Sequence, residues 1–163
     1  MIRTHPGPIL FCLLLLLGAC SRGPEVPEWQ LIATDPPAEA RLGRQQPFYV
    51  QFEVRSRAPV KVALMPRYRG EDAVEGLATQ AEITLPAGGG RAVASFFYWG
   101  QIPTRVDELR FTVSAPGQPS RQFSAPVNLT WRADPQPAPT PAAWVVEWRK
   151  TQPPPPADNP PSK

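Results

Sequence analysis

The sequence predicts an all-β domain, a single antiparallel β-sandwich of about seven strands, followed by a proline-rich tail. Between residues 28 and 132, apolar and polar side chains alternate with a period of two, which is typical of strands with one buried face. Turn residues separate these runs. No segment of the region carries the 3.6-residue apolar stripe of an amphipathic helix. The chain has 24 prolines, concentrated toward the C-terminus, where they oppose the formation of a packed core.

Seven segments are predicted as strands, in an order set by the alternation and by the turns between them. They are 29–33, 48–55, 60–64, 77–85, 91–99, 109–113 and 123–131. The turns are expected at 35–37, 58–59, 69–72, 88–90 and 116–117, where Gly, Pro and Asp gather. Pro126 lies within the last run and cannot donate a ladder hydrogen bond. The last strand is therefore expected at a sheet edge or with a bulge.

The number, length and spacing of these strands resemble those of immunoglobulin-like and fibronectin-III-like domains. The segment VDELRFTVSA, residues 106–115, is similar to the penultimate strand of that architecture. The resemblance implies one domain over residues 28–132, made of two antiparallel sheets packed face to face.

The N-terminal segment is predicted to be a targeting signal. Its apolar run from Ile9 to Leu17 is too short for a membrane-spanning helix, which needs about 20 residues, but has the length of a signal-peptide core. The tetrad Leu17-Gly18-Ala19-Cys20 resembles the lipobox of bacterial lipoproteins. This resemblance implies cleavage between Ala19 and Cys20 and attachment of lipid to the Cys20 sulfur.

On this interpretation, residues 1–19 form the signal peptide and residues 20–27 a short lipidated tether. More than one acyl chain on Cys20 would hold the protein on a membrane, at about 0.8 kcal/mol per buried CH₂. Ser21 follows the cysteine, in place of the Asp that resembles an inner-membrane retention signal. We therefore expect attachment to the outer membrane of the cell envelope, with the domain facing the periplasm.

Removal of residues 1–19 would also remove Cys12 and His5, the only histidine. A chain without histidine or a free thiol has no Ser-His-Asp triad, no Cys-His dyad and no zinc site built from those ligands. We expect no catalytic residues, no metal and no cofactor. The mature chain would keep 16 basic and 14 acidic residues, a balance that does not suggest nucleic-acid binding.

The segment Phe96-Phe97-Tyr98-Trp99 places aromatic side chains on both faces of one predicted strand. One face must be core. The other face is either an exposed binding surface or is covered by residues 101–103. Phe96, Tyr98 and Trp99 are the candidate binding residues from this strand.

The tail, residues 133–163, is expected to be largely disordered, with polyproline II character. Within it lies AAWVVEWRK, residues 142–150, whose two tryptophans are unusual in a disordered segment. As a strand, this island would place Trp144, Val146 and Trp148 on one face and could add to a sheet edge. Alternatively, it is a motif that docks on a partner. Trp144 and Trp148 are therefore also candidate binding residues.

Two charged groups are weaker candidates. Basic side chains around one turn, with two more on the next strand, could hold an anionic ligand or could form an ordinary solvated surface. These residues are Arg55, Arg57, Lys61, Arg67 and Arg69. Asp107 and Glu108 could contribute to a carboxylate pair for glycoside hydrolysis or could simply precede a strand.

The sequence is therefore predicted to encode a membrane-anchored, non-catalytic binding or structural module, an accessory subunit or adaptor of an envelope assembly. The expected partners are the membrane, through Cys20, and an envelope protein. A glycan- or lipid-binding lipoprotein that uses the strand Phe96–Trp99 is the alternative hypothesis. A hydrolase is the hypothesis that the residues support least.

Overall fold

The computed structural model describes residues 26–72, 76–79, 82–134, 136–137 and 139–152. The predicted signal peptide, Cys20 and most of the tether lie outside these ranges. None of the helices in the described ranges is long and apolar enough to cross a membrane.

The described chain forms ten strands and one helix. They are β1 (Glu28–Asp35), β2 (Glu39–Leu42), β3 (Pro47–Arg55), β4 (Val60–Tyr68), β5 (Glu71–Asp72), β6 (Leu77–Thr79), β7 (Ile83–Leu85), β8 (Gly90–Tyr98), β9 (Thr104–Ser114), β10 (Arg121–Trp131) and α1 (Ala143–Thr151).

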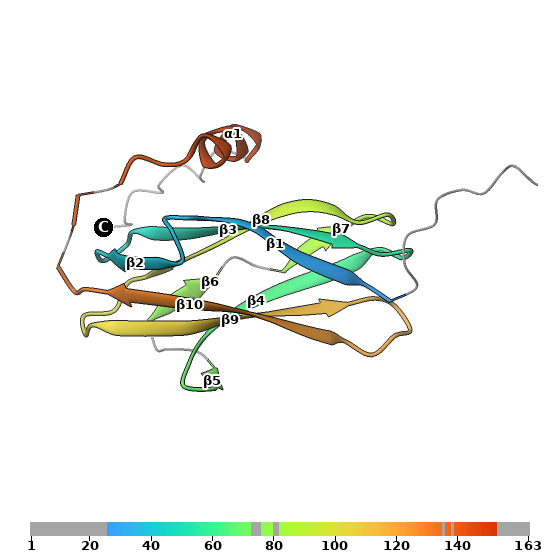
Figure 1. The fold of residues 1–163 in the computed structure, drawn as a ribbon, viewed down its shortest axis with the longest axis horizontal. Coiled ribbons are helices and arrows are strands. Elements are labelled where there is room, and N and C mark those ends of the chain that lie inside the picture. The colour runs from blue at the N-terminus through green and yellow to red at the C-terminus, as the bar shows by residue number, and fades with distance from the viewer. Residues whose placement is uncertain (1–25, 73–75, 80–81, 135, 138, 153–163) are drawn as a thin grey trace, which may run out of the picture.

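Two sheets pack face to face, which confirms the predicted all-β sandwich (Figure 1). One sheet has the order β1-β3-β8-β6 and is antiparallel throughout. The other has the order β2-β10-β9-β4-β5, with β7 also paired to β4. Its only parallel pair among the described strands joins β2 to β10, with Leu42 beside Trp131.

The core lies between the sheets and is built from the inward-facing half of each alternating strand. Its largest fully buried side chains are aromatic: Trp131, Phe48, Phe52, Phe96 and Phe111. They contact one another across the interface. The ring of Phe96 lies 5.5 Å from that of Trp131, and the ring of Phe52 lies 5.3 Å from that of Phe111. Burial of such large apolar groups is the main force that holds the two sheets together.

The predicted strands are present, with one important difference. The single strand predicted over residues 77–85 is two short strands in different sheets, because β6 pairs with β8 and β7 pairs with β4. The expected irregularity at Pro126 is confirmed, since the register of β10 against β9 shifts between Pro126 and Leu129. The strands β2 and β5 were not predicted, because segments of four and two residues are too short to show alternation.

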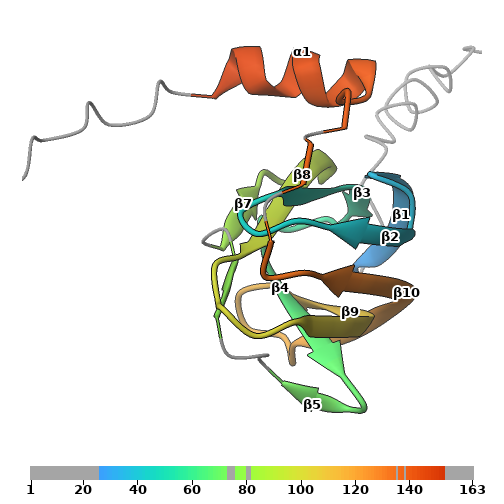
Figure 2. The same cartoon turned by 90° about the vertical axis from the view of Figure 1, so that its left-hand side faces the viewer.

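The tryptophan-containing island of the tail is a helix, not the strand considered from the sequence. The helix α1 lies on the outer face of the β1-β3-β8-β6 sheet (Figures 1 and 2). Val145, which a strand would have turned away from the two tryptophans, is the residue that α1 buries completely. The helical arrangement brings it onto the same face as Trp144 and Trp148.

Candidate binding surfaces

The aromatic run at the end of β8 divides between the core and the surface. Phe96 is completely buried and is not available to a ligand, contrary to the sequence-based assignment. Tyr98 is almost completely buried but lines the groove described below. Phe97 is 39% exposed and Trp99 is 58% exposed. The loop 101–103 does not cover the outer face, because Ile102 is itself 76% exposed. Its backbone instead accepts a hydrogen bond from the Tyr98 hydroxyl, at the carbonyl of Ile102.

Trp99 and Ile102 line an open groove of about 680 Å³ at one end of the sandwich. Two glycines shape its floor. A Cβ on Gly100 would lie 2.2 Å from the Tyr98 hydroxyl oxygen, and a Cβ on Gly76 would lie 2.9 Å from the Tyr98 ring. Glycine is therefore required where the backbone passes closely over this buried ring. The groove is completed by Arg44, Gln101, Pro103 and Thr104.

This groove lies at the end of the sandwich farthest from the start of β1. The register places Glu28 opposite Arg55, and Val54 opposite Gly90, at one end. The other end holds Pro47 opposite Phe97, together with the end of β10. We call this second end, with the groove, the distal end. In Figure 1 the arrowhead of β10 points toward it, and Figure 2 looks onto it.

The helix α1 carries the two other candidate tryptophans and packs against its own domain. Val145 contacts Tyr49 and Val93, which face outward from β3 and β8. The ring of Trp148 meets that of Tyr49 edge to face at 5.7 Å, and Arg149 donates a hydrogen bond to the Tyr49 hydroxyl. Trp144 and Trp148 are half-buried in this contact. They are not brought together with Trp99.

The start of the helix and the segment before it are also attached to the sandwich. The Ala142 amide donates to the Asp35 carboxylate at 2.9 Å, which places a negative charge beside the helix N-terminus. The Gln46 side chain, which is buried, donates to the carbonyls of Gln136 at 2.6 Å and Pro137 at 2.8 Å. Gln136, Pro137 and Ala142, between β10 and α1, therefore contact the domain directly.

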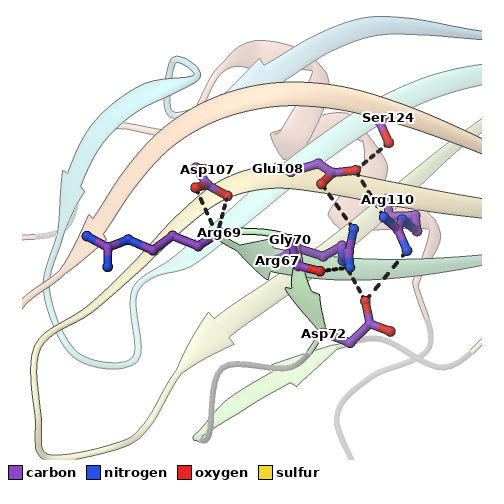
Figure 3. Close-up of polar contacts among 8 residues, drawn as sticks. All are labelled: Arg67, Arg69, Gly70, Asp72, Asp107, Glu108, Arg110 and Ser124. Atoms are coloured by element: carbon purple, nitrogen blue, oxygen red, sulfur yellow. Dashed lines mark hydrogen bonds and ion pairs between the residues drawn. The ribbon is translucent and has the colours of Figure 1, made fainter.

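The weaker candidate Asp107-Glu108 belongs to a network of ion pairs on the outer face of the second sheet (Figure 3). The Glu108 carboxylate lies 3.3 Å from Arg67 Nη1 and also accepts a hydrogen bond from Ser124. The Asp107 carboxylate accepts from the backbone amide of Arg69 at 3.0 Å. Both acids are held by structural partners that join β4, β9 and β10.

The network continues to β5. The Asp72 carboxylate lies 2.6 Å from Arg67 Nε and 3.8 Å from Arg110 Nη1. Arg67 was a candidate for an anionic ligand, but its side chain is only 11% exposed. Its charge is paired with Asp72 and Glu108, although its buried Nε makes no hydrogen bond within the described part of the chain.

The basic residues around the β3–β4 turn are also paired. Arg55 and Arg91 both contact the Glu53 carboxylate, at 2.9 and 3.3 Å, and Lys61 lies 3.2 Å from Glu82. The hydrogen bonds from Arg55 and then Arg91 lower the pKa of Glu53. In the described ranges, no group of three or more His, Cys, Asp or Glu residues is placed to hold a metal ion.

No protein-family model matches the chain, and no curated protein does. Among solved structures, the chain is similar to the Salmonella enterica SafA pilin in complex with the SafB chaperone, at 12% identity and a TM-score of 0.47. The match covers 66% of this chain and 55% of that one, so the chain spans little more than half of that structure's length.

A second similar structure is the ASH/PapD-like domain 7 of human CEP192, at 9% identity and a TM-score of 0.43, with 83% of this chain and 98% of that chain covered. A third is the Bacteroides ovatus GH5 xyloglucanase in complex with a XXXG heptasaccharide, at 10% identity and a TM-score of 0.30. That match covers 64% of this chain and 19% of the xyloglucanase chain.

Proposed function

We propose that the protein is a lipid-anchored, periplasm-facing, non-catalytic binding module of the cell envelope, with an immunoglobulin-like sandwich as its scaffold. The observation that supports this most is the exposure of Trp99 and Ile102 in the distal groove. Exposed apolar side chains that gather around a groove are typical of protein–protein and ligand-binding sites. The partner is a protein subunit of an envelope assembly.

The placement of the groove agrees with the proposed anchor. Seven residues join Cys20 to Glu28 and span at most about 25 Å when extended. The start of β1 is thus held near the membrane, and the distal end faces away from it. In this position the groove is open to proteins of the periplasm.

The partner contact is tested by crosslinking in intact cells, followed by purification of the full-length chain. Trp99→Ala and Ile102→Ala should each remove a stoichiometric protein partner. Met65→Ala is the control, because Met65 is 39% exposed on β4, outside the groove. Recovery of the same partners from all three variants would contradict the proposal.

A glycan ligand is the second candidate, because the groove places the exposed Trp99 ring beside the polar side chains of Gln101 and Thr104. A flat aromatic face with polar neighbours suits the apolar face of a sugar ring. Titration with soluble peptidoglycan fragments distinguishes the two functions. Saturable binding that Trp99→Ala abolishes, with protein partners unchanged, would favour the glycan.

The anchor has a separate test. Cys20→Ala should accumulate as an unprocessed precursor that incorporates no labelled fatty acid, whereas Cys12→Ala should be processed normally. A Cys20→Ala chain that is still cleaved and released would disprove lipidation without affecting the proposal for the groove.

A further inference from the structure

Four exposed arginines gather at the distal end, outside the groups that the sequence pattern singled out. They are Arg41, Arg44, Arg105 and Arg132. Arg41 and Arg105 both lie beside Thr130, one on β2 and the other on β9, so they share the outer face of the sheet. Neighbouring strands are about 4.8 Å apart. The two arginines therefore lie on either side of Thr130, one strand spacing away in each direction.

The other two arginines continue this group around the end of the sandwich. Arg132 directly follows β10, and its amide donates to the Leu42 carbonyl at 2.8 Å. The Arg44 amide donates to the Asp134 carbonyl, two residues beyond Arg132. These backbone contacts hold both arginines at the distal end.

Three of these arginines line hollows at the distal end. Arg41 and Arg132 line a hollow of about 420 Å³ beside Gln136. Arg44 lines the groove that contains Trp99 and Ile102. Positive charge and exposed apolar surface therefore lie side by side.

Within the described ranges, none of these four guanidinium groups forms an ion pair, unlike most other arginines of the two sheets. Arg55 and Arg91 are paired with Glu53, and Arg67 and Arg110 with Asp72 and Glu108.

The acidic side chains near the distal end form no ion pair with these four arginines in the described ranges. Glu39, Asp107 and Asp134 are exposed acids that each lie two residues along the chain from one of these arginines. Asp107 accepts from the Arg69 amide, and Asp35 accepts from the Ala142 amide. The four like charges repel one another, and no ion pair in the described ranges offsets this repulsion. Such an arrangement is expected where an oppositely charged partner binds.

We propose that the distal end binds an acidic segment of the protein partner. An aromatic or aliphatic side chain of that segment occupies the groove beside Trp99 and Ile102, and flanking carboxylates pair with the four arginines. Guanidinium groups suit this role because they bind carboxylates through two parallel hydrogen bonds. This inference rests on the proposed function, since it specifies the chemistry of the partner at the same surface.

The test uses the full-length chain solubilised in detergent and a phage-displayed library of 12-residue peptides. Enriched peptides should carry an excess of Asp and Glu around an aromatic or branched apolar residue. A synthetic copy of the strongest peptide is then titrated against variants. Arg105→Glu should weaken its binding by at least about tenfold, and added salt should weaken binding to the unmodified chain.

Arg121→Glu is the matched control. Arg121 is an exposed arginine at the start of β10, at the opposite end of the sandwich, and forms no ion pair in the described structure. This variant should bind the peptide as the unmodified chain does. Circular dichroism of both variants excludes misfolding as the cause of a loss.

Three results would overturn the inference: enriched peptides without an acidic excess, equal binding by Arg105→Glu and the unmodified chain, or equal losses in Arg105→Glu and Arg121→Glu. Its failure is distinguishable from failure of the proposed function. If Trp99→Ala loses the cellular partner and Arg105→Glu keeps it, the groove binds a partner of other chemistry. If Trp99→Ala keeps every partner, the proposed function itself fails.

Discussion

At the scale of single residues, the aromatic run of β8 shows what alternation can and cannot predict. The pattern correctly required one face of the strand to be core, and Phe96 and Tyr98 occupy it. It could not tell which of the two faces was buried, because both carry aromatic side chains. Only the packing of Phe96 on Trp131 decides this, and Trp131 lies 35 positions later in the chain.

The distal arginines were not predictable as a group for a similar reason. Arg41 and Arg44, Arg105, and Arg132 come from three distant segments of the sequence, and each is an ordinary exposed residue by itself. They meet only because β2 and β9 both pair with β10. The sequence pattern indicated instead basic residues near the β3–β4 turn and at the end of β4, such as Arg55 and Arg67, and these two have acidic partners.

The glycine turn before β8 gives a prediction at this scale. Gly88 and Gly89 both have positive φ, at 93° and 80°, but only Gly89 is closely packed. A Cβ there would lie 1.9 Å from the Val54 carbonyl oxygen, whereas a Cβ on Gly88 would meet nothing within 4 Å. Gly88→Ala should reduce the free energy of unfolding by about 1–2 kcal/mol through backbone strain.

Gly89→Ala adds a steric clash to the same backbone strain, so it should lower the free energy of unfolding by about 1–3 kcal/mol more than Gly88→Ala does. Urea unfolding of the two variants, followed by tryptophan fluorescence, provides the comparison. Equal midpoints for both would contradict the close packing of Gly89 against β3.

At the scale of elements, α1 is the clearest failure of the sequence prediction. Its residues include two valines and two tryptophans, all favourable in strands, and the surrounding prolines suggested an extended chain. A nine-residue helix is marginal by itself in water. Contact of Val145 and Trp148 with the outer face of β3 and β8 stabilises it, and local propensity carries no information about that contact.

The dependence of α1 on this contact is testable with two adjacent valines. Val145→Asp places a charge where the side chain is completely buried, so the helix should detach and unfold. Chymotrypsin should then cleave after Trp144 and Trp148 at least about tenfold faster, because a detached helix of this length is unstable.

Val146→Asp is the control for this experiment, since Val146 is 41% exposed on the same helix and the substitution is chemically identical. Cleavage in this variant should remain as slow as in the unmodified chain. Similar cleavage of both variants would mean that α1 does not depend on its contact with the sheet.

At the scale of the whole molecule, the start of β1, which follows the proposed tether, and the distal groove lie at opposite ends of the sandwich. Gly117, in the β9–β10 turn, lies at the end that holds the start of β1, and Gln101 lies at the distal end. In vesicles that contain an acceptor dye on lipid headgroups, a donor dye at position 117 should show more efficient energy transfer than one at position 101. Equal efficiencies would contradict the proposed orientation.

The pairing of β2 with β10 also determines when the fold can be completed during synthesis. These neighbours in the sheet are almost 90 residues apart in the chain, with Leu42 beside Trp131. A nascent chain that ends before β10 lacks both the partner of β2 and the Trp131 side chain that fills the core next to Phe96. The polypeptide therefore has no complete sandwich until its last strand has left the ribosome.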